Sequence, residues 1–350
     1  VASLTSRNIV PFFMQVALDG ATVIRTSPKA LKAGSEVPSF QVKARSLGSA
    51  PWTFAGVEEG DLIAALRRSR MTFGSISQIS RGSSSGADEV FILEQEGLGL
   101  RSRDGEFHSA EAESLRVPIF ASDFRRYEFA PRSVARIVFP YEVHDPGYKL
   151  LGEKELKGRF PKCYRYLTSK RKELEARKQY SEWYSFSAPR NLGLHERADF
   201  LVPLLANQGS FCLLPTSTRQ FCLMASGGFS ISLSATERST RLALLGVLNS
   251  KVVFWFLRQI SNRFRGGWIT CTKQYVEQIP LPGLADSRAS ALSSLVQYLL
   301  SATLTVSSAT TPHEGAAARS RATALEDEID RLVYELYELT PEEIAIVERG

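Results

Sequence analysis

The longest apolar stretch of the chain, Leu242 to Leu257, limits what the protein can fold into. Asn249, Ser250 and Lys251 interrupt it, so it falls short of the ~18 apolar residues that a membrane-spanning helix needs. Its spacing predicts an apolar helix over residues 240–259 that must lie in a core. A chain of 350 residues, 43% hydrophobic, can bury one large core or two to three smaller ones. We therefore expect a soluble, multi-part, cytoplasmic protein without a membrane partner.

The remaining patterns alternate between strand and helix. Apolar runs cut by Gly and Pro predict strands and turns over residues 1–60, and a helix is expected over Glu58 to Ser69, with Leu62, Ile63 and Leu66 on one face. Residues 127–142 and 211–233 read as short strands. The sequence thus predicts an α+β fold: a strand-rich domain with inserted helices, followed by a C-terminal helical pair.

The C-terminal region predicts two helices that pack together. One helix is expected over Asp286 to Ser307, followed by a Ser/Thr/Ala-rich linker. Apolar residues then recur at alternating spacings of four and three, which is typical of an amphipathic helix: Leu325, Ile329, Leu332, Leu336 and Leu339. We expect an antiparallel pair within the chain, with another subunit as the alternative. Thr340 to Glu343 has the pattern of a capping box that starts a last short helix.

The charge of the chain is unevenly distributed. Residues 149–178 contain eleven Lys and Arg against four Glu, whereas residues 325–350 contain nine acidic residues and two Arg. Without that acidic tail, the net charge of +6 becomes +13, and one dense basic stretch is the pattern expected of a protein that binds phosphates. The stretch predicts a helix after Pro161, with Phe160, Tyr164, Leu167, Arg171 and Leu174 on one stripe that faces the core. The alternative is a solvated helix face.

Two loops combine small residues with hydrogen-bond donors. Residues 81–88 hold Gly82, Gly86 and three serines, so this loop could approach phosphate oxygens or simply form a hairpin turn. Residues 263–273 add Gly266 and Gly267 to two arginines and Trp268. Arginine can recognise guanine or phosphate with two parallel hydrogen bonds, and the tryptophan could stack beside a displaced base. The alternative is a core tryptophan with solvated arginines.

The chemistry of an enzyme is missing from the sequence. The four cysteines form no C-x-x-C pair, and the histidines do not flank them at zinc-ligand spacing. No Asn is followed by the Pro-Pro-Tyr that would hold a target amine, and Gly97-Leu98-Gly99 is a weak cofactor signal. Glu326 to Glu328 lie on the outer face of an expected helix, where a Mg²⁺ site is not expected. We expect no cofactor or metal in this chain and no methylation by it alone.

Several segments together resemble a known family. FPYE at residues 139–142, the basic helix, WYSF with Pro189-Arg190, Leu248 to Lys251 with Tyr275 to Pro282, and the final EIDRLVYELYELT occur in the order seen in TaqI-like N6-adenine DNA methyltransferases and fused restriction-modification enzymes. Residues 52–348 resemble their C-terminal target-recognition region. In that family, a preceding catalytic domain binds S-adenosylmethionine and flips an adenine. This sequence lacks that domain and an initiator Met, which we interpret as a fragment or a processed chain.

The resemblance implies a specificity module for double-stranded DNA, with the methyltransferase catalytic domain as its partner. The expected domains are an N-terminal strand-rich segment (1–50), a DNA target-recognition domain (51–283) and a C-terminal helical hairpin (284–350). The alternatives are a protein-interaction scaffold and a degenerate nuclease or methyltransferase. The residues predicted to contact DNA are Arg81, Ser83, Ser85, Tyr141, Lys162, Arg165, Lys170, Arg171, Lys172, Arg190, Arg263, Arg265, Trp268 and Lys273.

Overall fold

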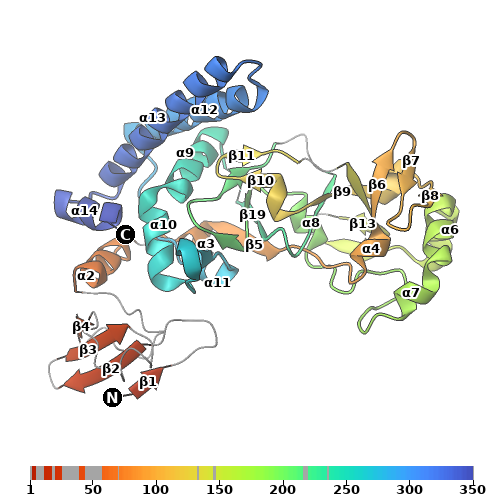
Figure 1. Ribbon diagram of the computed structural model, residues 1–350, viewed down its shortest axis with the longest axis horizontal. Helices are drawn as coiled ribbons and strands as arrows, with labels where there is room; N and C mark the ends of the chain where they lie inside the picture. The colour runs from red at the N-terminus through yellow and green to blue at the C-terminus, as the bar shows by residue number, and fades with distance from the viewer. Residues whose placement is uncertain are drawn as a thin grey trace. The chain divides into compact units, whose positions relative to one another are not determined.

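The computed structural model is an α+β protein that divides into two compact units (Figure 1). It describes the strands at 2–4, 12–17, 20–25 and 39–43, and then residues 57–69, 71–131, 134–144, 147–215, 220–234 and 236–349. Unit 1 comprises residues 1–75, 205–209 and 237–350, and unit 2 comprises residues 76–204 and 210–236. The predicted α+β class is therefore confirmed. The division differs from the predicted domains, because residues 237–283 belong to the same unit as the C-terminal helices.

The N-terminal part of unit 1 is a meander of four antiparallel strands. These are β1 (Ala2–Leu4), β2 (Phe12–Ala17), β3 (Gly20–Arg25) and β4 (Ser39–Lys43), in sequence order. Helix α2 (Val57–Leu66) follows, and its Leu62, Ile63 and Leu66 are all buried, as their spacing predicts. Trp52, where the family resemblance begins, lies outside the described residues.

The apolar stretch expected to form one helix forms two. Helices α9 (Arg238–Asn249) and α10 (Lys251–Ile260) are bent by 56° at Ser250. The hydroxyl of Ser250 accepts a hydrogen bond from the Val253 amide at 3.3 Å, which makes Ser250 the N-cap of α10. The polar residues that interrupt the apolar run are therefore a helix boundary. Both helices lie in the core, with Leu245, Leu248 and Phe256 fully buried.

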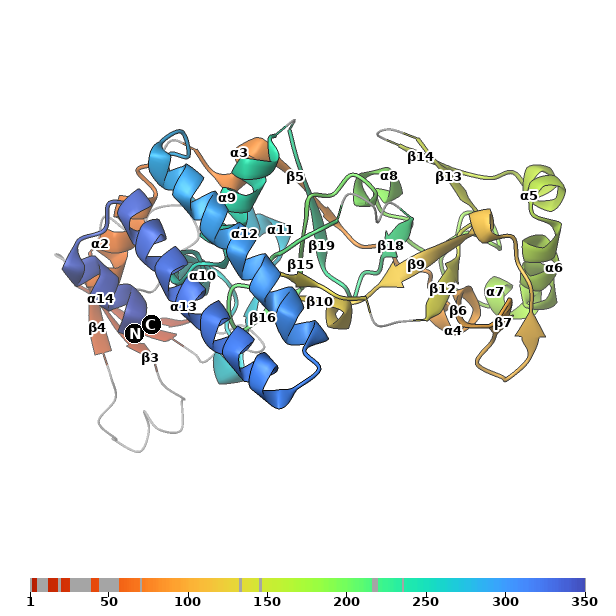
Figure 2. The same cartoon turned by 90° about the horizontal axis from the view of Figure 1, so that it is seen from above.

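Helices α12 (Ser287–Ser308) and α13 (Pro312–Leu336) pack side by side as an antiparallel pair (Figure 2). This confirms the pairing predicted within the chain. The predicted Ser/Thr/Ala-rich linker is wrong, because only three residues separate the helices and the alanine-rich segment forms the first turns of α13. Helix α14 (Pro341–Arg349) begins with the predicted capping box: the Thr340 amide donates to Glu343 at 2.9 Å, and the Glu343 amide donates to the Thr340 hydroxyl at 3.3 Å.

Hydrogen bonds join the segments that carry the family resemblance. The amide of Lys251 donates to the buried carboxylate of Asp330 at 2.8 Å, and its ammonium group pairs with Glu348 at 3.0 Å. The hydroxyl of Tyr337 donates to the Pro280 carbonyl at 2.6 Å. The Lys251 contacts satisfy the N-terminus of α10 and attach α13 and α14 to it, and the Tyr337 contact attaches the end of α13 to the segment after α11. These segments therefore have a structural role in unit 1.

Unit 2 is built mainly from two sheets. One has the order β18–β9–β12–β6–β7–β8, in which only the β18–β9 pair is parallel. Its strands are β6 (Ile92–Glu96), β7 (Gly99–Arg101), β8 (Phe107–His108), β9 (Leu115–Ile119), β12 (Ala135–Val138) and β18 (Phe221–Leu223). The other sheet is antiparallel, with the order β17–β15–β19–β5, formed by β5 (Ser77–Arg81), β15 (Phe200–Val202), β17 (Cys212–Leu213) and β19 (Phe229–Leu233).

Short elements complete unit 2. Two hairpins are formed by β10 (Phe124–Arg125) with β11 (Glu128–Phe129), and by β13 (Tyr141–Val143) with β14 (Tyr148–Leu150). Four short helices of unit 2 are α4 (Asp88–Phe91), α8 (Leu192–His195), η2 (Ala112–Ser114) and η3 (Ala121–Asp123), and α3 (Phe73–Ile76) lies at the end of the first segment of unit 1. Helix α4 occupies the start of the apolar run after the 81–88 loop, and β6 forms its second half.

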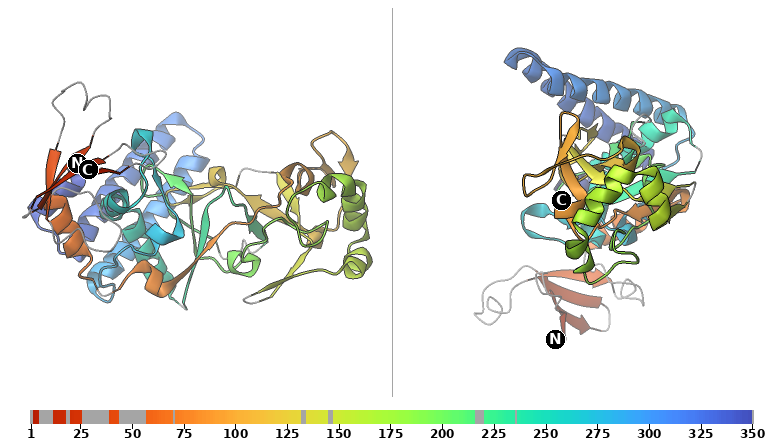
Figure 3. Two further views of the ribbon diagram at one scale, coloured as in Figure 1. Left: turned by 90° about the horizontal axis from the view of Figure 1, so that it is seen from below. Right: turned by 90° about the vertical axis from the view of Figure 1, so that its right-hand side faces the viewer.

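The basic stretch forms three short helices instead of one. These are α5 (Glu153–Arg159), α6 (Pro161–Ser169) and α7 (Arg171–Glu175). They pack on the six-stranded sheet through one core that includes Leu156, Leu167 and Leu174 together with Leu93 and Ile137 (Figure 3). The predicted apolar stripe is correct at its buried ends and wrong at Arg171, which is exposed.

Two segments pass a membrane-span test by length and composition: α12, and the bent pair α9–α10. This corrects the expectation from sequence that no segment is apolar enough. Core helices of soluble proteins pass the same test, and α9 and α10 are mostly buried. Only 33% of the tested window of α12 is buried, so this helix keeps an exposed apolar face.

Candidate nucleic-acid interface

A small hairpin in unit 1 connects α10 to α11 (Lys273–Val276). Its two sides are tied by hydrogen bonds from the Phe264 amide to the Trp268 carbonyl, at 2.7 Å, and from the Thr270 amide to the Asn262 carbonyl, at 3.1 Å. Strand β20 (Ile269–Thr270) also pairs with β16 (Leu205–Ala206). At the tip, η4 (Arg265–Gly267) contains Gly266 and Gly267 at φ values of +71° and +77°, which glycine adopts without strain. The glycines thus allow the tight turn that presents the tip.

The tip of this hairpin exposes two aromatic rings and one free guanidinium group. The side chains of Phe264 and Trp268 are both 41% exposed, so Trp268 is not the core residue that the alternative interpretation required. Arg265 is exposed and has neither an ion pair nor a hydrogen bond with any described side chain. Lys273, at the start of α11, is also exposed. Exposed rings beside unpaired cations can stack on bases and neutralise phosphates.

Arg263 has a different position from the one predicted. Its Nε donates to the Arg258 carbonyl at 2.5 Å, and its Nη2 donates to Gln259 at 2.7 Å. These bonds satisfy the C-terminal end of α10, where a cation also complements the helix dipole. Arg263 is therefore engaged within the protein, and its predicted contact with a base or phosphate stays a prediction. Phe264, which was not among the predicted residues, is exposed at the tip instead. Its position directly before the Arg-Gly-Gly turn could have identified it from the sequence.

In unit 2, the basic helices α5–α7 and their flanks expose seven cations that form no ion pair with the described residues. Three of them were predicted to contact DNA: Lys162, Arg165 and Lys172. The other four are Lys149, Lys154, Lys157 and Lys178. Lys162 and Arg165 are three residues apart on α6 and therefore share one face. Unpaired cations on one short segment favour binding to a polyanion.

The remaining cations of the stretch are engaged within the protein. Lys170 pairs with Asp104 at 2.5 Å, and its side chain is only 13% exposed. The hydrogen bond with Asp104 raises the pKa of Lys170, and the same contact holds the pKa of Asp104 well below its ordinary value. Arg171 pairs with Glu175 at 2.7 Å and lies over the Trp183 ring at 4.8 Å. Lys170 and Arg171 could therefore meet phosphates only in competition with these pairs, and their contacts with DNA stay predictions.

Two further groups in the basic region are structural. Arg177 donates to the carbonyls of Leu174, Ser85, Ser185 and Trp183 at 2.6–2.9 Å, and burial lowers its pKa. The N-terminus of α6 is occupied by the carboxylate of Glu111, which accepts from the amides of Lys162 and Cys163 at 2.9 and 3.0 Å. A helix N-terminus commonly binds anions, but here the protein supplies its own.

In the glycine- and serine-rich loop at 81–88, the two serines predicted to contact DNA are buried, which contradicts their predicted role. Ser83 and Ser85 are 0% exposed: the Ser83 hydroxyl donates to the Arg190 carbonyl at 3.1 Å, and the Ser85 hydroxyl donates to Asp88. A Cβ atom at Gly82 would lie 2.1 Å from the Met224 carbonyl oxygen, so the glycine permits contact with the protein's own backbone. Arg81 and Arg190 flank this loop with exposed side chains and stay predicted contacts.

Tyr141 is also a core residue rather than a DNA contact. Its side chain is 5% exposed, and its hydroxyl accepts a hydrogen bond from the Phe186 amide at 2.6 Å. Burial raises its pKa, and its ring packs against Phe186 with centroids 5.1 Å apart. The FPYE segment thus connects strand β12 to the core of unit 2.

One group of side chains near Lys170 has the composition of a metal site. Ligand atoms of Asp104, Glu106 and His108 all lie within 4.8 Å of one another. A metal ion there would have to displace the ammonium group of Lys170 from Asp104. Only the carboxylates of residues 326–328 were weighed from the sequence as Mg²⁺ ligands, although the spacing of two residues in Asp104, Glu106 and His108 places their side chains on one side of an extended hairpin. We interpret the group as the anchor between this hairpin and α6.

The candidate interface therefore has two parts, each described within its own unit. The hairpin tip of unit 1 contributes Arg265, Trp268 and Lys273 of the predicted residues, together with Phe264. Unit 2 contributes the unpaired cations of the α5–α7 region, and Arg81 and Arg190. Comparison with models of protein families and with curated proteins found no match for this chain.

Proposed function

We propose that this chain binds double-stranded DNA and acts as the sequence-reading module of an N6-adenine DNA methyltransferase. The observation that carries the proposal is the set of seven exposed cations in residues 149–178 that form no ion pair in the described part of the chain. Phosphate neutralisation by such residues supplies affinity that does not depend on sequence. The association with a methyltransferase rests on the sequence resemblance.

The hairpin tip supports a reading role in addition to simple affinity. Arg265 can donate two parallel hydrogen bonds to guanine, and Trp268 has the exposed flat face needed for stacking on a base. Gly266 and Gly267 have no side chains, so the backbone at the tip can approach a groove of the DNA closely. Affinity and specificity would thus come from different parts of the protein.

Selection from a library of randomised duplexes tests the proposal. The chain should enrich a defined sequence, and Arg265→Ala should lower the discrimination at one or two positions by about 1–3 kcal/mol. Lys172→Gln, a change in the basic stretch, is the matched control and should weaken binding to all duplexes alike. A chain that binds DNA but enriches no sequence would contradict the reading role, and a chain that binds no DNA would contradict the whole proposal.

A further inference from the structure

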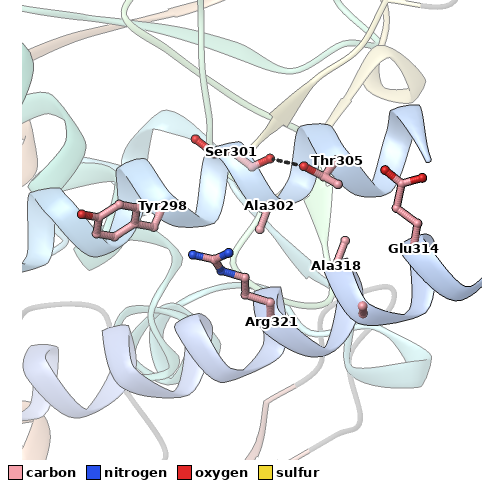
Figure 4. Close-up of a pocket in the computed structure, with 8 residues that line it drawn as sticks. Tyr298, Ser301, Ala302, Thr305, Glu314, Ala318 and Arg321 are labelled. Atoms are coloured by element: carbon pink, nitrogen blue, oxygen red, sulfur yellow. Dashed lines mark hydrogen bonds between the residues drawn. The ribbon is translucent and has the colours of Figure 1, made fainter. Parts of the chain in front are cut away.

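A groove of about 330 Å³ lies between the two helices of the C-terminal pair (Figure 4). Helix α12 lines it with Tyr298, Ser301, Ala302 and Thr305. Helix α13 lines it with Glu314, Ala317, Ala318 and Arg321. None of these residues belongs to the candidate nucleic-acid interface.

The residues that line the groove have the same spacing on both helices, with small residues in the middle of each set. On α13, Glu314 and Arg321 are seven residues apart and therefore share one face, with Ala317 and Ala318 midway between them. On α12, Tyr298 and Thr305 have the same separation, with Ser301 and Ala302 midway between them. Since the helices are antiparallel and the same groove contains both midpoints, the small residues of the two helices lie at one level. Small side chains at the centre allow another helix to approach closely.

We propose that this groove is the interface with a second copy of the chain. A twofold axis perpendicular to α12 and α13 at the level of the small residues would set each helix antiparallel to its own copy. Glu314 of one chain would then face Arg321 of the other, and the same pair would form twice because a twofold interface uses one patch on both subunits. The four helices would form an antiparallel bundle.

The charges of the groove and the exposed apolar surface beside it both favour a second copy of the chain as the partner. Arg321 is exposed and has no hydrogen bond or ion pair with the residues that the structure describes, although Glu314 lies on the same helix. Beside the groove, α12 exposes 57% of Tyr298 and 68% of Leu304, which an adjacent helix pair would cover. A lipid surface is a poorer occupant because it would have to desolvate both charges without pairing them.

Light scattering coupled to size exclusion, over about 1–200 µM of the full chain, tests this interface. The wild type should form a concentration-dependent dimer. Arg321→Glu places two carboxylates opposite each other at both ends of the interface, so it should raise the dissociation constant of the dimer at least about tenfold. The charge exchange Glu314→Arg with Arg321→Glu should restore the constant to within about threefold of the wild type.

Arg319→Glu is the matched control, since Arg319 is exposed on the same helix but does not line the groove. This variant should dimerise like the wild type. A wild type that stays monomeric at all concentrations would overturn the proposal, and so would a dimer that is insensitive to Arg321→Glu. Binding of a monomeric wild type to anionic lipid vesicles, lost on Leu304→Ser, would overturn it in favour of a membrane surface.

Discussion

The structure separates the cations of residues 149–178 into two sets, and the salt dependence of DNA binding should separate them too. Lys162, Arg165 and Lys172 are exposed and form no ion pair with the described side chains. Arg159 in α5, Lys170 between α6 and α7, and Arg171 in α7 pair with Glu155, Asp104 and Glu175. Only the first set can bind phosphates without first losing an internal ion pair.

The expected magnitude follows from counterion release. Each phosphate that the protein neutralises contributes about −0.9 to the slope of log K against log salt concentration. Replacement of Lys162, Arg165 and Lys172 by Gln should therefore make the slope less negative by up to about 2.7. Replacement of Arg159, Lys170 and Arg171 by Gln should change it by less than about 1, because their charges are already compensated.

Fluorescence anisotropy with a labelled duplex, measured across a series of NaCl concentrations, gives both slopes. Circular dichroism should show that each triple variant keeps the helical content of the wild type. Equal flattening of the slope by both triple variants would refute the reasoning from ion pairs. An unchanged slope in the first variant would assign the exposed cations to an ordinary solvated surface.

Two further predictions concern the stability of unit 2. His195 is fully buried, burial lowers its pKa to about 4, and in the unfolded chain it should titrate near 6.5. The unfolded state therefore takes up a proton first as the pH falls, so the free energy of unfolding should drop by about 2 kcal/mol between pH 7 and pH 5 in urea titrations. His195→Gln should lack this part of the pH dependence; an identical profile in the variant would contradict it. Arg177→Met should lower the free energy of unfolding by at least about 3 kcal/mol, because it removes side-chain hydrogen bonds to four backbone carbonyls. The neighbouring Lys178→Met should change it by no more than about 0.5 kcal/mol, and a similar cost for both variants would show that the carbonyl contacts do not matter.

Local patterns predicted those features that depend on residues close in sequence. The capping box needs only Thr340 and Glu343. The apolar spacing from Leu325 to Leu339 predicted a helix with one buried face; Ile329, Leu332 and Leu336 are buried, whereas Leu339 lies beyond the end of α13. The helix of Leu62, Ile63 and Leu66 followed in the same way. Periodicity of this kind reports which side of an element faces a core, without reference to the element that provides the core.

Contacts between distant residues decided the rest. Composition predicted an accessible Gly/Ser loop and a free Lys170, but Ser83 is covered by Arg190, 107 residues away, and Lys170 is neutralised by Asp104, 66 residues away. These partners are far away in the sequence, so the local sequence pattern around Ser83 or Lys170 cannot reveal them. Whether a charged or hydroxyl group can reach a ligand depends on burial and pairing, which only the tertiary structure determines.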